Sequence, residues 1–316
     1  MNLTQLEYLK ALATYRSFSL AAQKLKITQP ALSLQIQKLE EELDLKLVDR
    51  TKRPLNFTPE GEIFYRKAVE ILKMTEQLKQ LSTEMSEEVS GDLSVGIIPT
   101  LSPYLTPLFI DELNSNYPKL QLEITELKTE EIINSIKLGN LDCGVLSTPI
   151  DTTGVRSMPL FYERFFIYIS EKHQFFSEEK INISKLNTEE IWYLEEGNCF
   201  QNQVNSICQI NYQKKASQNL VYKSSSIESL RRIVENKNGV TFIPELATVN
   251  IPSDFEEMVK EFSDQQPVRE ISIVIPANFA KEKQVNALME IIRKSIPSRM
   301  LEKPASPIID TSLRIA

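Results

Sequence analysis

The sequence predicts a multidomain protein of mixed α+β and α/β class, with a small helical module, one long helix and a two-lobed α/β body. Three observations support this prediction. Residues 1–58 carry nine Lys or Arg and six Asp or Glu, a net charge of +3 that leaves −10 for the remaining residues. Apolar residues then recur every seven positions from Phe64 to Met85. From Leu93 onward, strand and helix patterns alternate, which is typical of a sheet covered by helices.

Composition places the chain among soluble globular proteins. Its 316 residues allow two or three domains, and 41% hydrophobic with 25% charged residues is ordinary for that class. No basic segment followed by an apolar one opens the sequence, so no signal peptide is predicted. Conspicuous apolar runs such as residues 165–169 are too short to span a bilayer. We therefore expect a cytoplasmic protein without membrane contact, in a reducing compartment where a disulfide is transient.

Several kinds of enzyme chemistry are disfavoured. The chain has one histidine, His173, in a polar stretch that predicts a surface position, and no Gly-x-Ser-x-Gly motif precedes a helix. The three cysteines, Cys143, Cys199 and Cys208, do not have the close spacing of a zinc site. We expect neither a metal nor a cofactor, and we expect that the protein is not an enzyme.

Residues 1–58 have the layout of a helix-turn-helix followed by a wing. Helices are predicted over residues 4–15, from Ser17 or Ser19 onward, and after Thr28, which serves as an N-cap. On the third helix Leu32, Ile36 and Leu39 share one side. The opposite side is uncharged or basic and is formed by Gln29, Pro30, Ser33, Leu34, Gln37 and Lys38. A polar helix face of this kind suits the major groove of DNA.

The chemistry of this face predicts how it would read DNA. Gln pairs with adenine, Ser with several base edges, and an exposed Leu contacts a thymine methyl. Basic residues of the wing suit phosphate or minor-groove contact. The predicted DNA-binding residues are Thr28, Gln29, Pro30, Ser33, Leu34, Arg50 and Arg53. The alternative is a small helical bundle with no nucleic-acid role.

Three segments of this module, residues 18–22, 28–40 and 57–61, resemble the winged helix-turn-helix of LysR-type transcriptional regulators. They read Phe-Ser-Leu-Ala-Ala, Thr-Gln-Pro-Ala-Leu-Ser-Leu-Gln-Ile-Gln-Lys-Leu-Glu and Phe-Thr-Pro-Glu-Gly. The similarity covers essentially the whole module. It implies a regulator that binds double-stranded DNA.

A long helix is predicted for residues 59–88, opened by Thr58 as N-cap and Pro59 in the first turn. Its apolar seam is spaced as in a coiled coil and consists of Phe64, Ile71, Leu78 and Met85, with Met74 and Leu81 between them. We expect a dimerisation helix, because two DNA-binding modules related by a two-fold axis fit a two-fold symmetric DNA site. A core-facing helix of a monomer is the alternative. Residues 89–92 are predicted to form a hinge.

Residues 93–298 are predicted to form a mostly parallel sheet with helices on both faces, in two lobes. Lobe I comprises residues 93–162 and 268–298, and lobe II residues 163–267. Predicted strands are 93–98, 120–126, 141–146, 158–170, 191–194, 220–223, 240–243 and 268–275, and predicted helices are 102–116, 129–138, from 199, 227–236 and from 280. The layout resembles the periplasmic-binding-protein-like effector domain of LysR-type regulators. Residues 299–316 are predicted to be a loosely structured tail.

Cys199 and Cys208 are nine residues apart in one predicted helix. Nine helical residues span about 13.5 Å, whereas a disulfide needs Cα atoms within roughly 4.4–6.8 Å. The two thiols can therefore bond only if this segment rearranges. The helix N-terminus is expected to lower the pKa of Cys199, and Cys208 has no such help. Two unrelated small apolar side chains in a core helix are the alternative.

The effector domain resembles, in particular, the hydrogen-peroxide-sensing OxyR group of the LysR family. The similar segments are residues 96–100, 103–105, 141–143, 196–199, 226–231 and 239–244, together with the step from Cys199 to Cys208. The resemblance implies a peroxidatic Cys199 and a resolving Cys208. It also implies peroxide-binding roles for Thr100, Thr129, Gly197 and Asn198, and thiolate stabilisation by Arg269.

One residue departs from the pattern of that group, which has histidine where this chain has Asn198. Asparagine forms hydrogen bonds but supplies neither a proton nor a positive charge. Structural alternatives exist for the other residues: N-caps for Thr100 and Thr129, and a surface ion pair for Arg269. Cys143 is predicted to be a core residue.

The sequence as a whole therefore predicts a cytoplasmic LysR-type activator of oxidative-stress genes that senses hydrogen peroxide through a reversible Cys199–Cys208 disulfide. The family resemblance implies a homo-oligomer, a dimer of dimers, with RNA polymerase and a thiol reductant such as glutaredoxin or thioredoxin as further partners. One alternative is a LysR-type regulator that binds a small carboxylate metabolite through Thr100, Ser102 and Ser225. Another is a thiol peroxidase, which has no need for residues 1–58.

Overall fold

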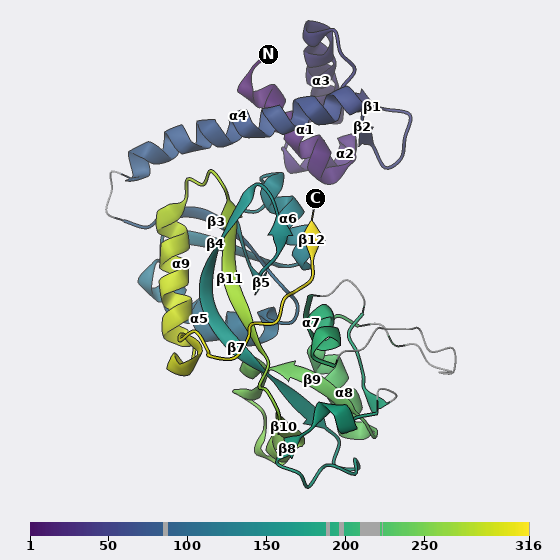
Figure 1. Ribbon diagram of the computed structural model, residues 1–316. Coiled ribbons are helices and arrows are strands. Elements are labelled where there is room, and N and C mark those ends of the chain that lie inside the picture. Colours follow the sequence, from purple (N-terminus) through teal and green to yellow (C-terminus); the bar gives the residue numbers. More distant parts are fainter. Residues whose placement is uncertain (85–87, 188–189, 196–198, 209–221, 223, 316) are drawn as a thin grey trace. The chain divides into compact units, whose positions relative to one another are not determined.

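The computed structural model describes residues 1–84, 88–187, 190–195, 199–208, 222 and 224–315 (Figure 1). The chain divides into two compact units, one formed by Met1–Glu88 and Leu138–Asn140 and the other by Val89–Lys137 and Leu141–Ala316. Each unit has its own buried apolar residues. None of the described helices is long and apolar enough to cross a membrane.

The N-terminal unit consists of helices followed by a short hairpin and a long helix. Its elements are α1 (Leu3–Tyr15), α2 (Phe18–Lys24), α3 (Gln29–Leu43), β1 (Val48–Asp49), β2 (Asn56–Phe57) and α4 (Pro59–Glu84). Side chains cap the first three helices: Asn2 caps α1, Ser17 caps α2 and Thr28 caps α3. β1 and β2 pair antiparallel. The predicted helices, the Ser17 and Thr28 caps and the wing are confirmed.

The core of this unit explains why α4 changes character along its length. Tyr65, Ala68 and Val69 of α4 are buried with apolar residues of α1, α2 and α3, and Phe64 packs against the same core. Further along α4, Leu72 still packs against this core, but three apolar side chains are exposed: Ile71 is 40% exposed, Met74 61% and Leu78 68%. Phe64 therefore belongs to the core rather than to the predicted seam. Met85, the last seam residue, lies outside the described residues.

The C-terminal unit is built around an eight-stranded sheet in the order β4-β3-β5-β11-β7-β10-β8, with β9 paired to β7. Its strands are β3 (Gly91–Ile97), β4 (Leu120–Glu126), β5 (Cys143–Thr148), β7 (Val155–Ile169), β8 (Lys180–Ile181), β9 (Val240–Pro244), β10 (Val259–Phe262) and β11 (Val268–Pro276). The α-helices are α5 (Ser102–Asn116), α6 (Thr129–Lys137), α7 (Cys199–Cys208), α8 (Ile227–Asn236) and α9 (Glu282–Ser295). Short 3-10 helices are η1 (Ile183–Lys185), η3 (Glu245–Thr248), η4 (Ser253–Met258) and η5 (Ser298–Met300), and a two-stranded sheet joins β6 (Asp151–Thr152) to β12 (Arg314–Ile315).

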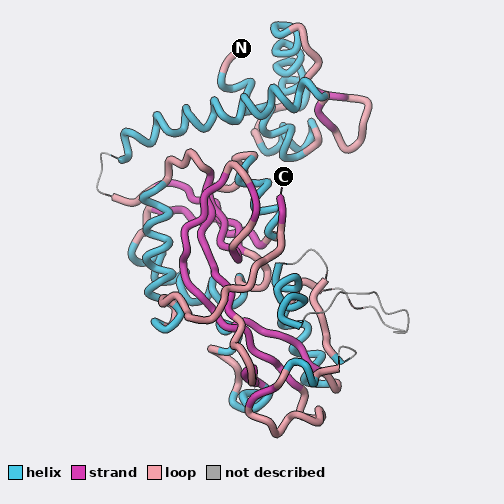
Figure 2. Tube along the Cα trace, viewed as in Figure 1, coloured by secondary structure: helices cyan, strands magenta, loops and turns pink. Residues whose placement is uncertain are grey.

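The expected mostly parallel sheet is wrong, because β3, β4 and β5 and the short pair of β8 and β10 are parallel but the central strands are antiparallel. β3 pairs parallel with β4 and β5, as βαβ connections require. β11 pairs antiparallel with both β5 and β7, and β7 pairs antiparallel with β9 and β10. The reason is that β7 and β11 carry the chain from one lobe to the other and back, which puts them in opposite directions (Figure 2).

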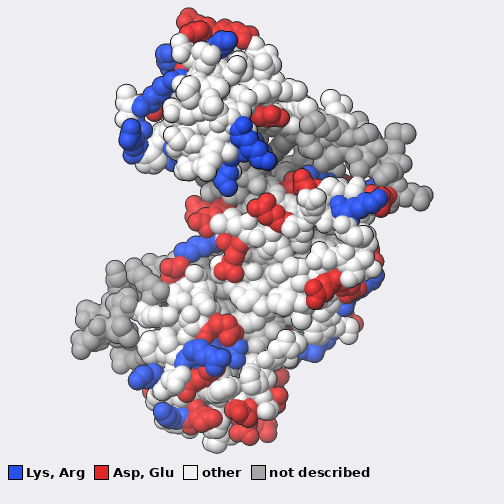
Figure 3. Space-filling model, turned by 180° about the vertical axis from the view of Figure 1, so that it is seen from behind, with Lys and Arg blue, Asp and Glu red and all other residues white. Residues whose placement is uncertain are grey.

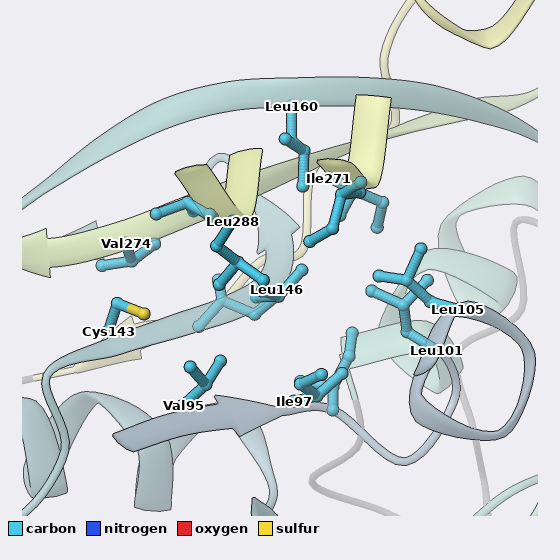
Figure 4. Packing of buried hydrophobic residues seen from close by; sticks show 14 of the residues in the cluster. Val95, Ile97, Leu101, Leu105, Cys143, Leu146, Leu160, Ile271, Val274 and Leu288 are labelled. Atoms are coloured by element: carbon cyan, nitrogen blue, oxygen red, sulfur yellow. The ribbon is translucent and has the colours of Figure 1, made fainter. Parts of the chain in front are cut away.

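Two apolar cores lie along this sheet, one in each lobe. Residues of β3, β5, β11, α5, α6 and α9 form the first core, part of which is shown in Figure 4 with Val95, Cys143, Leu146 and Leu288 pointing toward one another. Residues of β7, β9, α7 and α8 form the second. β7 contributes to both, with Phe161 in the first core and Phe165 in the second. The predicted division into two lobes has this physical basis.

Four sequence-based expectations need correction or fall outside the described residues. His173 is buried, 4% exposed, because its ring accepts a hydrogen bond from the Phe175 backbone N–H and contacts Glu190. The tail is not loose, since residues 308–315 hydrogen-bond to the sheet. The expected strand at residues 191–194 is reduced to a bridge at Ile191, and most of the expected strand at 220–223 lies outside the described residues.

Candidate functional site

The exposed side of α3 is the candidate DNA-reading surface. Gln29, Pro30 and Leu34 are exposed and Ser33 is half-buried, whereas Leu32, Ile36 and Leu39 are buried beneath them. Thr28 accepts a hydrogen bond from the Ala31 backbone N–H at 3.4 Å and so begins the helix. Figure 3 shows groups of basic side chains on one face of this unit. The predicted inner and outer sides of α3 are thus arranged as expected.

Arg50 is tied to the reading helix rather than extended into solvent. Its NH1 donates a hydrogen bond to Ser33 Oγ at 3.0 Å, and its NH2 lies 3.3 Å from Glu40 Oε2. The guanidinium also stacks 5.2 Å from the centre of the Phe18 ring. Arg50 therefore fixes the Ser33 hydroxyl, leaving the hydroxyl proton free to donate. Arg53 is exposed in the loop between β1 and β2.

Glu40 is a functional candidate that the sequence did not reveal. Its side chain is buried and accepts hydrogen bonds from the backbone N–H groups of Leu47, at 2.9 Å, and Val48, at 3.2 Å. With Arg50 on its other oxygen, it joins α3 to the beginning of the wing. Its position four residues after the buried Ile36 is the only signal that could have indicated it.

The candidate redox site lies at the first residue of α7. Cys199 is 2% exposed, and its sulfur accepts a hydrogen bond from the Thr129 hydroxyl at 3.4 Å. Thr129 begins α6, so the amino ends of two helices meet at this sulfur. The next residue, Phe200, packs against Phe165 with ring centroids 5.0 Å apart. Cys199 and Phe200 thus belong to different cores.

A buried ion pair lies beside the cysteine. Arg269 of β11 is fully buried, and its Nε donates to Glu163 Oε1 of β7 at 2.8 Å. Its NH1 donates to Thr100 Oγ1 at 3.1 Å, and its NH2 to the Thr100 carbonyl at 3.3 Å. The guanidinium lies 5.0 Å from the centre of the Phe200 ring. The alternative of a surface ion pair for Arg269 is therefore wrong.

The N-cap alternative for Thr100 is also wrong, because the N-cap of α5 is Leu101. Glu163 is the second residue that the sequence did not reveal. A lone acid inside an apolar strand was its only signal, and its partner lies 106 residues away in the chain.

Burial is the largest influence on the thiols. It raises the pKa of Cys199, while the Thr129 hydrogen bond and the Arg269 charge act in the opposite direction. The backbone N–H groups of Cys199 and Phe200 at the helix N-terminus lower this pKa, as expected, but the net pKa is raised, because removing the thiolate from water costs more than the helix end and its neighbours return. Burial also raises the pKa of Cys208 to about 12. Cys143 is buried in the first core, as predicted, and burial raises its pKa strongly.

The thiols of Cys199 and Cys208 are free and form the two ends of one helix. Cys208 is half-buried and packs against the second core. This arrangement holds one thiol beside hydrogen-bond donors and the other in an apolar setting. Gly197 and Asn198, which were also expected to bind peroxide, lie outside the described residues.

Comparison with known proteins adds to this geometry. Residues 3–62 match the family model described as bacterial regulatory helix-turn-helix protein, lysR family. Residues 86–297 match the model described as LysR substrate binding domain.

Individual proteins are similar over most of the chain. The chain is 35% identical to the hydrogen peroxide-inducible genes activator of Haemophilus influenzae over 79% of its length and 82% of that protein. It is 35% identical to the DNA-binding transcriptional dual regulator OxyR of Escherichia coli over 78% of its length and 80% of that protein. Full-length OxyR of Pseudomonas aeruginosa, solved as a variant, is similar in structure, with a TM-score of 0.80, 29% identity and coverage of 96% and 99% of the two chains.

Proposed function

Because the chain belongs to the LysR family of DNA-binding transcription regulators, we propose that it senses hydrogen peroxide through a reversible Cys199–Cys208 disulfide and thereby activates oxidative-stress genes. The relatives named as peroxide-inducible activators support this function. One observation carries the proposal: the two free thiols end a single helix, and the first is buried against a hydroxyl donor beside a buried guanidinium.

The first step is attack by the Cys199 thiolate on one peroxide oxygen. The S–O bond forms as the O–O bond breaks, so Cys199 becomes a sulfenic acid and hydroxide leaves, taking up a proton as water. Thr129 and Arg269 stabilise the thiolate, since both lower its pKa. Thr100, Gly197 and Asn198 are proposed to hold the peroxide. Burial keeps most of the thiol protonated at neutral pH, so the rate of attack on peroxide depends on how strongly these partners stabilise the thiolate.

The second step joins the two sulfurs and releases water. The Cys208 thiol attacks the sulfenic sulfur, the S–O bond breaks, and the thiol proton leaves with the hydroxyl group. In α7 the sulfurs belong to residues separated by about 13.5 Å along the axis, far beyond disulfide reach. Closing the bond therefore requires α7 to unwind. The proposed remodelling extends to residue 212, and residues 209–212 lie outside the described residues.

The signal is proposed to reach DNA through subunit packing. Ile71, Met74 and Leu78 form an exposed apolar stripe on α4, spaced three and four residues apart as in a coiled coil. A second copy of the chain is the proposed occupant, and two such dimers form the proposed tetramer. Remodelling of α7 then changes the packing of the effector domains and the spacing of the DNA readers, and with it the contact to RNA polymerase.

Resetting requires two electrons and two protons from outside the protein. A cytoplasmic dithiol reductant of the glutaredoxin or thioredoxin class is proposed to reduce the disulfide by thiol exchange. The protein is then a stoichiometric sensor rather than a peroxidase.

The test is a brief pulse of low-micromolar hydrogen peroxide, followed by thiol labelling and mass spectrometry. We expect a Cys199–Cys208 crosslink in the full-length protein, and a sulfenic acid at Cys199 in the Cys208→Ser variant. Cys143→Ser is the matched control and should crosslink normally, since Cys143 is fully buried in β5 and is not part of α7. A protein that activates transcription on peroxide exposure without this crosslink would refute the mechanism.

A regulator that binds a carboxylate metabolite through Thr100, Ser102 and Ser225 is the competing function. The buried cation nearest to Thr100 is already paired with an internal carboxylate, Glu163. An incoming carboxylate would have to displace that partner at a high desolvation cost. Under the competing function, Cys199→Ser would respond normally to its effector.

A further inference from the structure

The C-terminal residues 308–315, here named the strap, contact the helix that must unwind. Figure 1 shows the yellow chain leaving α9, passing α7 and ending at β12. Gln203 Nε2 donates to the Ile309 carbonyl at 2.9 Å, and Asn202 Nδ2 donates to the Thr311 carbonyl at 3.2 Å. Both donors lie between Cys199 and Cys208 in the chain. Any disulfide between those cysteines closes a loop that contains them.

The strap itself is fixed to the sheet of the first lobe. The Ile309 N–H donates to the Val268 carbonyl at 2.8 Å, and the fully buried Thr311 donates through its hydroxyl to the Pro149 carbonyl at 2.6 Å. The Asp151 N–H donates to the Leu313 carbonyl at 3.0 Å, and β12 pairs with β6. These bonds do not involve α7. The strap carbonyls therefore form a rigid support against which α7 rests.

Separation of α7 from the strap is unfavourable because it breaks buried hydrogen bonds of Gln203. It is fully buried, and its Nε2 also donates to Ser147 Oγ at 3.1 Å, so one amide joins α7 to both β5 and the strap. When α7 unwinds, the Ile309 carbonyl loses a buried partner. An unpaired buried carbonyl is unfavourable, so these contacts favour the helical, reduced state.

We propose that the strap holds α7 in its helical form, and that Asn202 and Gln203 are positioning residues that set how readily the Cys199–Cys208 disulfide forms. This inference rests on the proposed function for its redox consequence. Its structural part, support of α7 by the strap, is independent of the chemistry. Loss of one contact should raise the ratio of oxidised to reduced protein by roughly threefold to tenfold, since that is the range of a single hydrogen bond.

The experiment compares two isosteric changes in the full-length protein. Asn202→Asp places a carboxylate against the Thr311 carbonyl, which removes the donor and adds repulsion. Asn205→Asp is the matched control, because Asn205 is also half-buried in α7 but serves as an acceptor for Gln201 Nε2 at 2.8 Å, a role that Asp retains. A chain ending at Pro307 removes the whole strap.

Two measurements decide the outcome. In the reduced protein, amide hydrogen exchange in α7 should accelerate threefold to tenfold in Asn202→Asp and remain near wild type in Asn205→Asp. In thiol–disulfide equilibration, Asn202→Asp should favour the oxidised form by a similar factor, and a tenfold change corresponds to a midpoint potential about 30 mV more negative.

Equal rates of amide hydrogen exchange in Asn202→Asp, Asn205→Asp and the wild type would refute the proposal that the strap supports α7. If the truncated chain does not fold, the two point variants still decide. If the wild type forms no disulfide, the proposed function fails, and the exchange comparison still decides whether the strap supports α7. Faster exchange without a change in potential would remove the positioning role and leave a structural contact.

Discussion

The hydroxyl of Thr129 donates a hydrogen bond to the sulfur of Cys199 across 3.4 Å, in a site where both side chains are buried. This hydrogen bond is the largest of the influences that lower the pKa of the thiol. Removing the donor should therefore raise that pKa and slow peroxide attack. We expect Thr129→Val to reduce the second-order rate constant about tenfold, as loss of a hydrogen bond to a charged group implies.

Stopped-flow oxidation with hydrogen peroxide measures this constant. Thr129→Ser keeps a hydroxyl at the same place and is the control that should restore most of the rate. An unchanged rate in Thr129→Val would show that the hydroxyl has no part in activating the thiol.

The rate of Cys199 oxidation should depend strongly on pH. Burial raises the pKa of this thiol, so at neutral pH the protonated form dominates, and only the thiolate attacks peroxide. Below the pKa the thiolate fraction rises about tenfold for each pH unit, so the rate constant should increase about a hundredfold between about pH 6 and 8. A rate that stays level across this range would mean that the thiol is already ionised.

Glu163→Gln should destabilise the C-terminal unit, because it leaves the buried Arg269 without a counter-charge. Breaking a buried ion pair from one side costs about 3–5 kcal/mol in the free energy of unfolding. Urea denaturation measures this value. The control is Glu261→Gln, since Glu261 is 39% exposed and pairs with Arg164 at 3.5 Å, where a loss below about 1 kcal/mol is expected. Equal losses in both variants would contradict the role of burial.

Ser33→Ala should relax sequence preference on DNA. Arg50 occupies an acceptor position of the Ser33 hydroxyl at 3.0 Å, so the hydroxyl proton is directed elsewhere and suits an acceptor on a base edge. We expect discrimination at one base pair to fall by about 1–3 kcal/mol, with little change on random DNA. Arg53→Ala is the contrasting variant and should weaken specific and random binding together, with a salt slope smaller by about one. Equal effects of Ser33→Ala on both DNAs would rule out base reading.

Leu78→Glu should prevent self-association. Leu78 is 68% exposed on α4 and lies in line with Ile71 and Met74, so a charge here would be buried in the proposed seam. Sedimentation equilibrium should show smaller assemblies at micromolar concentration. Arg66→Glu changes an exposed residue of the same helix away from the stripe and should leave the assembly intact. An unchanged mass for Leu78→Glu would place the interface elsewhere.

Local elements could be predicted from the sequence because their signals are local. The period of apolar residues located α8 at Ile227–Asn236, and the change of pattern before Cys199 located the beginning of α7. The inner side of α3 followed from the spacing of Leu32, Ile36 and Leu39 in the same way.

Long-range pairings could not be predicted. Arg269 faces Glu163 because β11 lies antiparallel to β7. The sequence around either residue gives no indication of its partner. The burial of His173 likewise depends on Glu190, which comes from another loop. The strap was missed for a different reason: its acceptors are backbone carbonyls, which every residue possesses and no sequence pattern distinguishes.

Cys199 and Phe200 are consecutive residues whose side chains insert into separate apolar interiors. One peptide bond at Cys199 therefore links the apolar cores of the two lobes. Movement of the Cys199 sulfur out of its buried position must also displace the neighbouring Phe200 ring, so a local change at Cys199 alters the packing of both lobes. A thiol whose sequence neighbours packed within a single lobe would not couple its movement to the other lobe.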